Sequence, residues 1–324
     1  MSDLENDSDE DLETVKKRVT ERLRRDLGPL VEGALNDSKT TDILLNADGN
    51  LWLKRLGEPS RIIGKIQPWR AMSAMKTLAG LLGKTIGATE PILDGELPFG
   101  NERFAGQLPP VVSSPCFAIR KPAINVFPLS LYVTQGIMTQ EQCDAIKKAV
   151  REHKNILVVG GTGSGKTTLI NAIIQEMVDN DPNERVFIIE DTGEIQCRAI
   201  NCVQYHTTLE VSMTDLLKTT LRMLPDRIIV GEVRGAEALD LLDSWNTGHD
   251  GGAGTLHSNS TESALQRLKS LITRNKHAPS DIEPLIAEAV HVVVHIARTP
   301  EGRRVEGILE ILGYENGNYK TRKL

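Results

Sequence analysis

The chain has 324 residues, and 38 Lys and Arg against 44 Asp and Glu give it a formal net charge of −6. This length suggests about two domains, and 40% apolar with 25% charged residues excludes a chain that is disordered throughout. The negative charge provides no overall attraction to nucleic acid or anionic lipid, so we expect no strong direct nucleic-acid binding.

The sequence has no segment that predicts membrane insertion or export. No apolar run approaches the roughly 18–20 residues that span a bilayer, and the acidic N-terminus is unlike a secretory signal. The four cysteines include no Cys-x-x-Cys pair, which favours free thiols over a zinc or redox site. We therefore expect a cytoplasmic protein.

The first part of the chain predicts a small α+β domain behind a tail. Residues 1–13 hold seven acidic and no basic residues, which is typical of a disordered, solvated tail. Apolar spacing predicts a helix over 12–27 that ends at Gly28-Pro29. Further along come a hairpin, a helix and short strands, predicted over 43–53, 69–82 and 92–119. Together these elements predict an N-terminal α+β domain of residues 14–122.

The rest of the chain predicts a linker and an α/β domain. Pro122 and Pro128 favour an extended linker over 123–138, and Thr139 is expected to cap a helix over 139–153. Strands are predicted at 156–159, 186–189, 228–230 and 254–256, with helices near 166–178, 214–222, 236–246 and 262–274. A strand over 291–297 and a hairpin of 305–311 with 314–320 follow. Alternating apolar strands and helices predict a mainly parallel sheet covered on both faces, in a domain of residues 139–324.

The most specific motif is the glycine-rich loop after the strand 156–159. It reads Gly160-Gly161-Thr162-Gly163-Ser164-Gly165-Lys166-Thr167-Thr168 and matches a P-loop in the strand-to-helix context that this motif requires. Glycines let backbone N–H groups converge on phosphate oxygens, and the helix N-terminus adds its dipole. Lys166 is expected at the β- and γ-phosphates and Thr167 on Mg²⁺. These nine residues are therefore predicted to bind ATP.

Carboxylates follow two of the later strands. Glu190 and Asp191 end the strand 186–189, and Glu232 follows the strand 228–230. We interpret Glu232 as the residue that polarises the attacking water. Gly231 stands where many P-loop enzymes have Asp, so the magnesium-side carboxylate is Glu190 or Asp191, or water carries more of the ligation. The alternative for Glu190 and Asp191 is a solvated strand end without a site.

A histidine and two arginines complete the candidate set. His257 follows the strand 254–256, where it could hydrogen-bond a γ-phosphate and report its loss; the alternative is a structural histidine. Arg103 and Arg120 lie in the N-terminal domain. An arginine held by one domain over a phosphate in the other could neutralise transition-state charge. Ordinary surface salt bridges are the alternative for both.

Four motifs together resemble the hexameric secretion ATPases of bacterial type II and type IV secretion systems and of type IV pili. They are GGTGSGKTT (160–168), IIEDTGEIQ (188–196), RIIVGEVRG (227–235) and GGAGTLHSNS (251–260). They occur in family order within residues 100–275. No cysteine quartet follows the histidine motif, unlike in the type II secretion exporters. Within the family the chain most resembles the TrbB-type conjugal transfer ATPases, and the short N-terminal domain and hairpin-like C-terminus favour that branch.

The resemblance implies a fold, an activity and partners. It implies a RecA-like P-loop domain with a smaller N-terminal α+β domain, assembled as a homo-hexamer. ATP with Mg²⁺ would lie between the two domains, near Arg103 and Arg120 and in reach of a neighbouring subunit. Lys166, Glu190, Glu232 and His257 would carry the chemistry. The protein would power pilus assembly or substrate transfer, held at the inner membrane by secretion or conjugation machinery proteins.

Two alternatives stay open from the sequence. A type IV pilus retraction or assembly ATPase shares the same core motifs and differs in its partners. A nucleotide-switched ring scaffold with little turnover is favoured only by Gly231, which replaces the expected aspartate.

Overall fold

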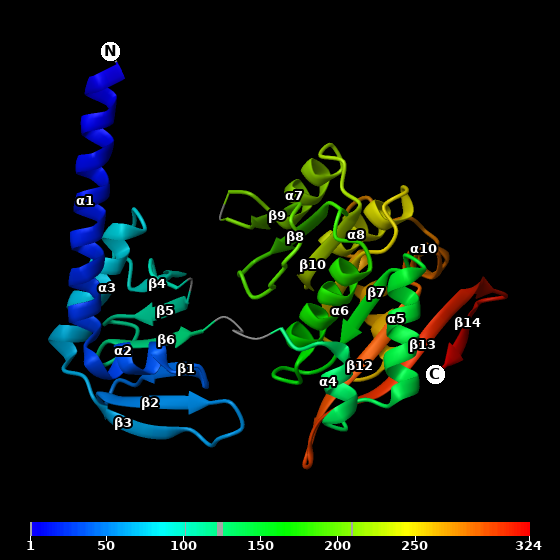
Figure 1. The fold of residues 1–324 in the computed structure, drawn as a ribbon, viewed down its shortest axis with the longest axis horizontal. Helices are drawn as coiled ribbons and strands as arrows, with labels where there is room; N and C mark the ends of the chain where they lie inside the picture. The colour runs from blue at the N-terminus through cyan, green and yellow to red at the C-terminus, as the bar shows by residue number, and fades with distance from the viewer. Residues whose placement is uncertain (1, 101, 122–125, 209) are drawn as a thin grey trace. The chain divides into compact units, whose positions relative to one another are not determined.

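The computed structural model describes residues 2–100, 102–121, 126–208 and 210–324, with side chains from Thr14 onward. The chain divides into two compact units, Met1–Ile124 and Asn125–Leu324. Figure 1 shows the elements of each unit, and each is described by itself.

The first unit is a mixed α+β fold built on an antiparallel sheet. The strand order is β3-β2-β1-β6-β5-β4. The strands are β1 (Thr40–Leu45), β2 (Asn50–Arg55), β3 (Arg61–Lys65), β4 (Ile92–Glu96), β5 (Arg103–Gln107) and β6 (Cys116–Arg120). The helices are α1 (Ser2–Leu27), α2 (Pro29–Asn36) and α3 (Pro68–Leu81). Leu23 of α1, Met75 of α3 and Ile43 of β1 share one buried core, so the helices pack on the sheet.

The start of the chain differs from the prediction. The backbone of residues 2–13 belongs to α1, whereas we expected a disordered tail there and a helix only from Leu12; Met1 lies outside the described residues. Pro29 then occupies the first position of α2, where a missing N–H costs no hydrogen bond.

The second unit is a doubly covered α/β sheet. Its order is β14-β13-β12-β7-β11-β10-β8-β9, parallel from β12 to β9 and antiparallel at β13 and β14. The strands are β7 (Ile156–Val159), β8 (Val186–Glu190), β9 (Cys202–His206), β10 (Arg227–Val233), β11 (Ala253–Leu256), β12 (Val292–Thr299), β13 (Gly302–Glu315) and β14 (Asn318–Lys323). The helices are α4 (Leu129–Thr134), α5 (Gln140–Arg151), α6 (Lys166–Asn180), α7 (Met213–Thr220), α8 (Glu237–Asn246), α9 (Thr261–Ile272) and α10 (Ile282–Ala289).

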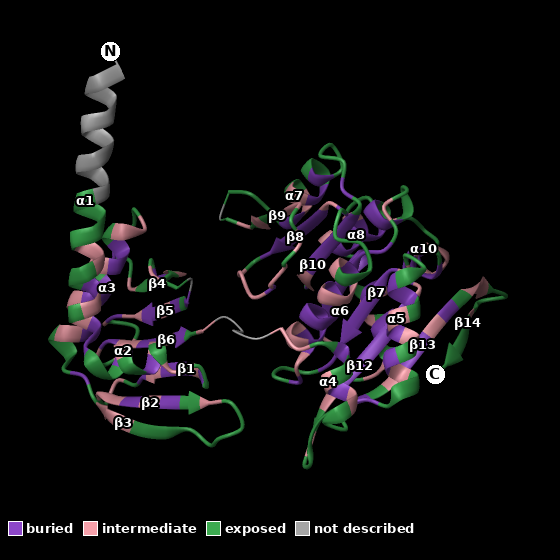
Figure 2. Cartoon of the chain, in the orientation of Figure 1, coloured by how far each residue is buried: buried purple, intermediate pink, exposed green. Residues whose placement is uncertain are grey.

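Alternate residues of the central strands enter two different cores. Ile156 and Val158 of β7 pack with α4, α5 and α6, while Leu157 and Val159 pack with α7, α8, α9 and α10. All four side chains are completely buried, as the colouring of β7 in Figure 2 shows. Both faces of the sheet are therefore covered, which is why these strands read as unbroken apolar runs. The predicted fold class, a RecA-like domain with a smaller α+β domain, is confirmed.

The linker predicted over 123–138 is only partly extended. Residues 122–125 lie outside the described residues, but 129–134 form α4, with Leu129 and Tyr132 buried in the core of the second unit. Pro128 precedes this helix as its N-cap, so it begins a helix here instead of continuing an extended segment. Strand β9 and helix α10 were not predicted either. The domain limits at 14, 122 and 139 stay predictions.

Candidate nucleotide-binding and catalytic site

The glycine-rich loop joins the buried strand β7 to α6 at the carboxyl edge of the parallel sheet. Gly163 (φ 71°) and Gly165 (φ 104°) adopt left-handed backbone conformations, which are open to glycine at little cost and strained for other residues. Gly165 is the N-cap of α6, so the N-terminus of this helix faces the loop. Its free N–H groups and positive dipole end suit an anion such as phosphate.

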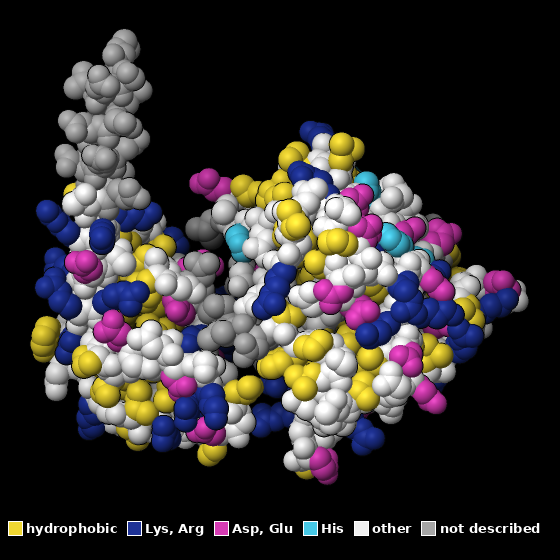
Figure 3. All heavy atoms as spheres, viewed as in Figure 1, with side chains coloured by type: hydrophobic (Ala, Val, Ile, Leu, Met, Phe, Trp, Pro, Cys, Tyr) yellow, Lys and Arg dark blue, Asp and Glu magenta, His cyan; other side chains and the backbone are white. Residues whose placement is uncertain are grey.

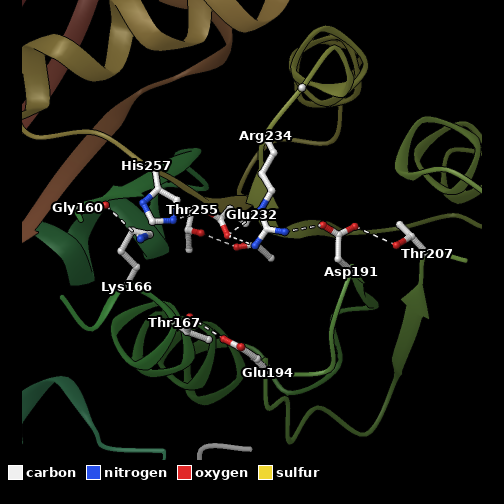
Figure 4. A network of polar contacts seen from close by, with 12 residues as sticks. Gly160, Lys166, Thr167, Asp191, Glu194, Thr207, Glu232, Arg234, Thr255 and His257 are labelled. Atoms are coloured by element: carbon white, nitrogen blue, oxygen red, sulfur yellow. Dashed lines mark hydrogen bonds and ion pairs between the residues drawn. The ribbon is translucent and has the colours of Figure 1, made fainter. Parts of the chain in front are cut away.

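Lys166 is held by the loop that it follows. Its Nζ donates to the carbonyl oxygens of Gly160 and Gly161 at 3.1 Å each, and the residue is only 8% exposed. Burial lowers the pKa of Lys166. The ammonium therefore lies folded over the loop with its hydrogen-bond donors directed at main-chain oxygens, as Figure 4 shows for Gly160.

The hydroxyl of Thr167 contacts a carboxylate that we did not predict. Thr167 Oγ1 donates to Glu194 Oε2 at 3.3 Å, and Asn171 of α6 bonds the main chain on both sides of Ile195. The loop after β8 is thus tied to the first turns of α6. Glu194 belongs to the IIEDTGEIQ motif, and its acidic side chain three residues after Asp191 was the available signal.

Glu190 is a buried carboxylate at the end of β8. It is 3% exposed, and its Oε1 accepts from the backbone N–H groups of Glu194 (3.2 Å) and Ile195 (3.0 Å). A Cβ at Gly231 would lie 2.9 Å from Glu190 Cγ. Glycine at 231 is therefore required by the packing of Glu190. This explains why the neighbouring strand carries no aspartate at that position.

The pKa of Glu190 makes stability depend on pH. Burial raises its pKa from 4.5 to about 7. Between these values the unfolded chain holds fewer protons than the folded one, so the free energy of unfolding falls as pH rises from 4.5 to about 7 and then levels off. The size of this fall is about 3 kcal/mol.

We expect Glu190→Gln to lose this dependence, because the amide stays neutral and its oxygen still accepts the two N–H groups. Urea unfolding across the pH range measures it, with Glu288→Gln on α10 as the matched control. The variant should equal the parent near pH 4 and exceed its stability at pH 8. A pH slope in Glu190→Gln identical to that of the parent would contradict the assignment.

Glu232 lies in β10 between an arginine and a histidine. Its Oε2 accepts from Arg234 Nε at 3.0 Å and Nη2 at 2.5 Å. His257 Nε2 lies 2.7 Å from Oε1, but without the alignment of a hydrogen bond, so Oε1 is a buried acceptor that no described donor satisfies. Burial lowers the pKa of His257. Figure 4 shows these side chains converging beside Lys166.

Asp191 does not lie with Thr167. It is exposed, its Oδ1 accepts from Thr207 at 2.9 Å and its Oδ2 from Arg234 at 3.3 Å. Of the two predicted magnesium-side carboxylates, Glu190 is the one that accepts a hydrogen bond from the backbone N–H of Glu194, the residue that contacts Thr167. Sequence reasoning also missed Arg234, although it stands in the RIIVGEVRG motif.

Three buried acceptors around the loop lack hydrogen-bond partners within the described residues. They are Ser164 Oγ, Glu190 Oε2 and Glu232 Oε1. Buried polar atoms are normally satisfied, so unpaired ones that gather at a P-loop fit a site that takes up a further polar group. Carboxylate and hydroxyl oxygens are also the ligand chemistry that Mg²⁺ prefers, directly or through water. The residues present therefore fit a magnesium-bound nucleotide.

Arg103 and Arg120 lie in the first unit, on neighbouring strands. They face each other directly across the β5–β6 pair, and Arg120 Nε donates to Asp42 Oδ1 at 3.0 Å. Like charges placed opposite each other in a sheet are destabilising unless a counter-charge lies nearby. For Arg120, the carboxylate of Asp42 is this counter-charge. Their predicted place near a γ-phosphate stays a prediction.

The fold and the loop define a P-loop protein with a RecA-like domain, and comparison with known proteins agrees. Residues 100–316 match the family model described as type II/IV secretion system protein. The chain is 46% identical over 304 residues, 94% of each chain, to the conjugal transfer protein TrbB of Rhizobium radiobacter. The chain therefore belongs to the type II/IV secretion system protein family.

Solved structures share the fold. The Legionella pneumophila ATPase DotB superposes with a TM-score of 0.60 at 21% identity, covering 85% of this chain and 77% of that one. The pilus retraction motor PilT with bound ADP superposes with a TM-score of 0.59 at 18% identity, covering 90% of this chain and 80% of that one.

Among the described residues, none of the helices combines the length and the apolar composition that a membrane span requires.

Proposed function

We propose that this protein is the ATP-hydrolysing hexameric motor of a conjugative type IV secretion system. One observation carries the proposal: a P-loop and the carboxylates Glu190 and Glu232, each with one buried oxygen that lacks a hydrogen-bond partner, meet at one sheet edge, in a chain that aligns over 94% of its length with a conjugal transfer protein. Hydrolysis would drive pilus assembly or substrate transfer.

The site residues divide the chemistry of ATP hydrolysis between them. The loop N–H groups and Lys166 bind the phosphates, and Lys166 stabilises the charge that develops on the γ-phosphate. Thr167, supported by Glu194, would hold Mg²⁺, with Glu190 on the same side. Mg²⁺ when bound neutralises charge on the phosphate oxygens. Glu232 Oε1 is placed to accept a hydrogen bond from the attacking water.

His257 and the two arginines act at the terminal phosphate in this proposal. His257 contacts Glu232, so a hydrogen bond from its imidazole to a γ-phosphate, and the loss of that bond, would be registered at the same carboxylate. Arg103 and Arg120 would approach that phosphate from an N-terminal domain, of the same or a neighbouring subunit. Their guanidinium groups would neutralise charge in the transition state.

We infer a cytoplasmic position at the inner membrane, reached through machinery proteins. On the face shown in Figure 3, many lysines and arginines stand among acidic and apolar side chains, and one group of them gathers on the second unit. The formal net charge of −6 gives no overall attraction to nucleic acid, which favours protein partners.

Steady-state phosphate release by the purified protein tests the proposal. Multiple turnovers per subunit support a motor, whereas slow release of about one phosphate per site identifies the ring scaffold with little turnover. A donor strain lacking the gene then separates the two motors. Restored conjugative transfer on complementation supports the conjugation role, and restored pilus retraction without transfer would place the protein with the retraction motors instead.

A further inference from the structure

Arg234 follows β10 directly, and its main chain is fixed in place. The backbone N–H groups of Arg234 and Gly235 both donate to Glu237 Oε1 at 2.7 Å. Glu237 is the first residue of α8, so one carboxylate ties the end of the strand to the start of the helix. The base of the Arg234 side chain is thereby fixed relative to Glu232.

The guanidinium group of Arg234 spans two carboxylates. Nε and Nη2 both donate to a single oxygen of Glu232, Oε2, and Nη1 donates to Asp191 Oδ2 at 3.3 Å. Asp191 is in turn held by Thr207, which follows β9. Figure 4 shows the chain of contacts from Thr207 through Asp191 and Arg234 to Glu232. The hydrogen bond with Glu232 raises the pKa of Arg234.

This arrangement selects one oxygen of Glu232 for the reaction. Because Oε2 accepts both arginine donors, Oε1 is the oxygen left without a hydrogen-bond donor. We propose that Arg234 is a positioning residue that orients Glu232 so that Oε1 meets the attacking water, with Asp191 as the outer anchor of the arginine. This inference rests on the proposed function, and deepens it by assigning Asp191 to the arginine instead of to the metal.

An incidental surface ion pair is the alternative, since Arg234 is half exposed. Such pairs contribute little to stability and require neither a fixed backbone nor a second carboxylate. Glu232 also faces the ammonium group of Lys166 from α6. A counter-charge is therefore present without Arg234, so the contribution we assign to Arg234 is orientation.

Kinetics of four variants test the proposal: Arg234→Gln, Arg234→Lys, Asp191→Asn and the double variant Asp191→Asn with Arg234→Gln. Arg222→Gln, an exposed arginine after α7, is the matched control. Affinity for a fluorescent ATP analogue with Mg²⁺ is measured beside kcat and KM, and circular dichroism checks folding.

Arg234→Gln should lower kcat about 10- to 100-fold, which is the cost of a misplaced catalytic group, with KM and analogue affinity within about threefold of the parent. Arg234→Lys should recover part of the loss, because one ammonium can still reach Oε2. Asp191→Asn should lower kcat less, and should have no further effect in the double variant, because it acts through Arg234.

The remaining outcomes separate a failure of this inference from a failure of the proposed function. An unchanged kcat in Arg234→Gln overturns the inference while the proposed function stands. A loss of affinity parallel to the loss of kcat shows that Arg234 binds phosphate directly and also overturns it, as does an additive effect of Asp191→Asn. If the parent itself turns over no ATP, the proposed function fails and the inference fails with it.

Discussion

Glu232→Gln is expected to bind nucleotide as the parent does and to lose hydrolysis. Arg234 donates two N–H groups to one oxygen of residue 232. The single amide oxygen of glutamine satisfies those donors, which turns the NH₂ group towards the position of Oε1. An NH₂ group cannot accept a hydrogen bond from water, so kcat should fall at least about 100-fold, with affinity for MgATP within about threefold.

Steady-state phosphate release and equilibrium binding of a fluorescent ATP analogue measure the two halves of this expectation. Glu301→Gln, in the turn between β12 and β13, is the matched control and should keep the activity of the parent. Turnover of Glu232→Gln within a few-fold of the parent would remove Glu232 from the water-polarising role.

Lys166→Ala is expected to remove hydrolysis and to weaken nucleotide binding together. In the structure the Lys166 Nζ donors are held by the carbonyl oxygens of Gly160 and Gly161, beside the position of the phosphates. Charge-assisted hydrogen bonds to phosphate are among the strong ones, and loss of one such group at a developing charge costs about 100- to 1000-fold in rate.

The variant also removes the Lys166 donor from the carbonyl oxygen of Gly160, whereas that of Gly161 still accepts from the backbone N–H of Ser164 at 3.3 Å. Loss of a donor costs about 1–3 kcal/mol when the acceptor is buried. Thermal unfolding must therefore confirm that Lys166→Ala is folded before its kinetics are interpreted. Lys276→Ala, at an exposed lysine after α9, is the control. Normal turnover in folded Lys166→Ala would refute the assignment of the phosphate loop.

Much of the fold followed from local patterns. The runs 156–159 and 228–230 form parallel strands buried on both faces, because a sheet covered by helices needs apolar residues at every position. Thr139 caps α5 with a capping box completed by Gln142, a signature that is readable within four residues. The glycine loop was equally readable, since its φ angles demand glycine at fixed positions.

The partners of individual side chains at the site did not follow from the sequence. Nothing in the local pattern distinguishes Asp191 from Glu194, yet the loop between them turns one towards Arg234 and the other towards Thr167. Periodicity describes strands and helices and carries no information on such loops. The role of Gly231 likewise required the position of a neighbouring strand, because it is Glu190 that fills the space beside it.

Helix α4 was not predicted for the same reason, because local sequence patterns do not show tertiary contacts. Pro122 and Pro128 indicated an extended segment by their effect on the residues before them, whereas Leu129 and Tyr132 lie on one face of a short helix and are buried. Burial of Leu129 alone is worth roughly 1.5–3 kcal/mol, and only the tertiary structure shows that a core is available to it.

Calorimetric titration of the purified full-length protein with ATP, with and without Mg²⁺, tests most directly whether residues 160–168 hold a nucleotide. We expect saturable binding that strengthens when Mg²⁺ is present and that is lost in Lys166→Ala. Absence of any magnesium-dependent binding of adenine nucleotides by folded protein would contradict the assignment of the site and of the motor.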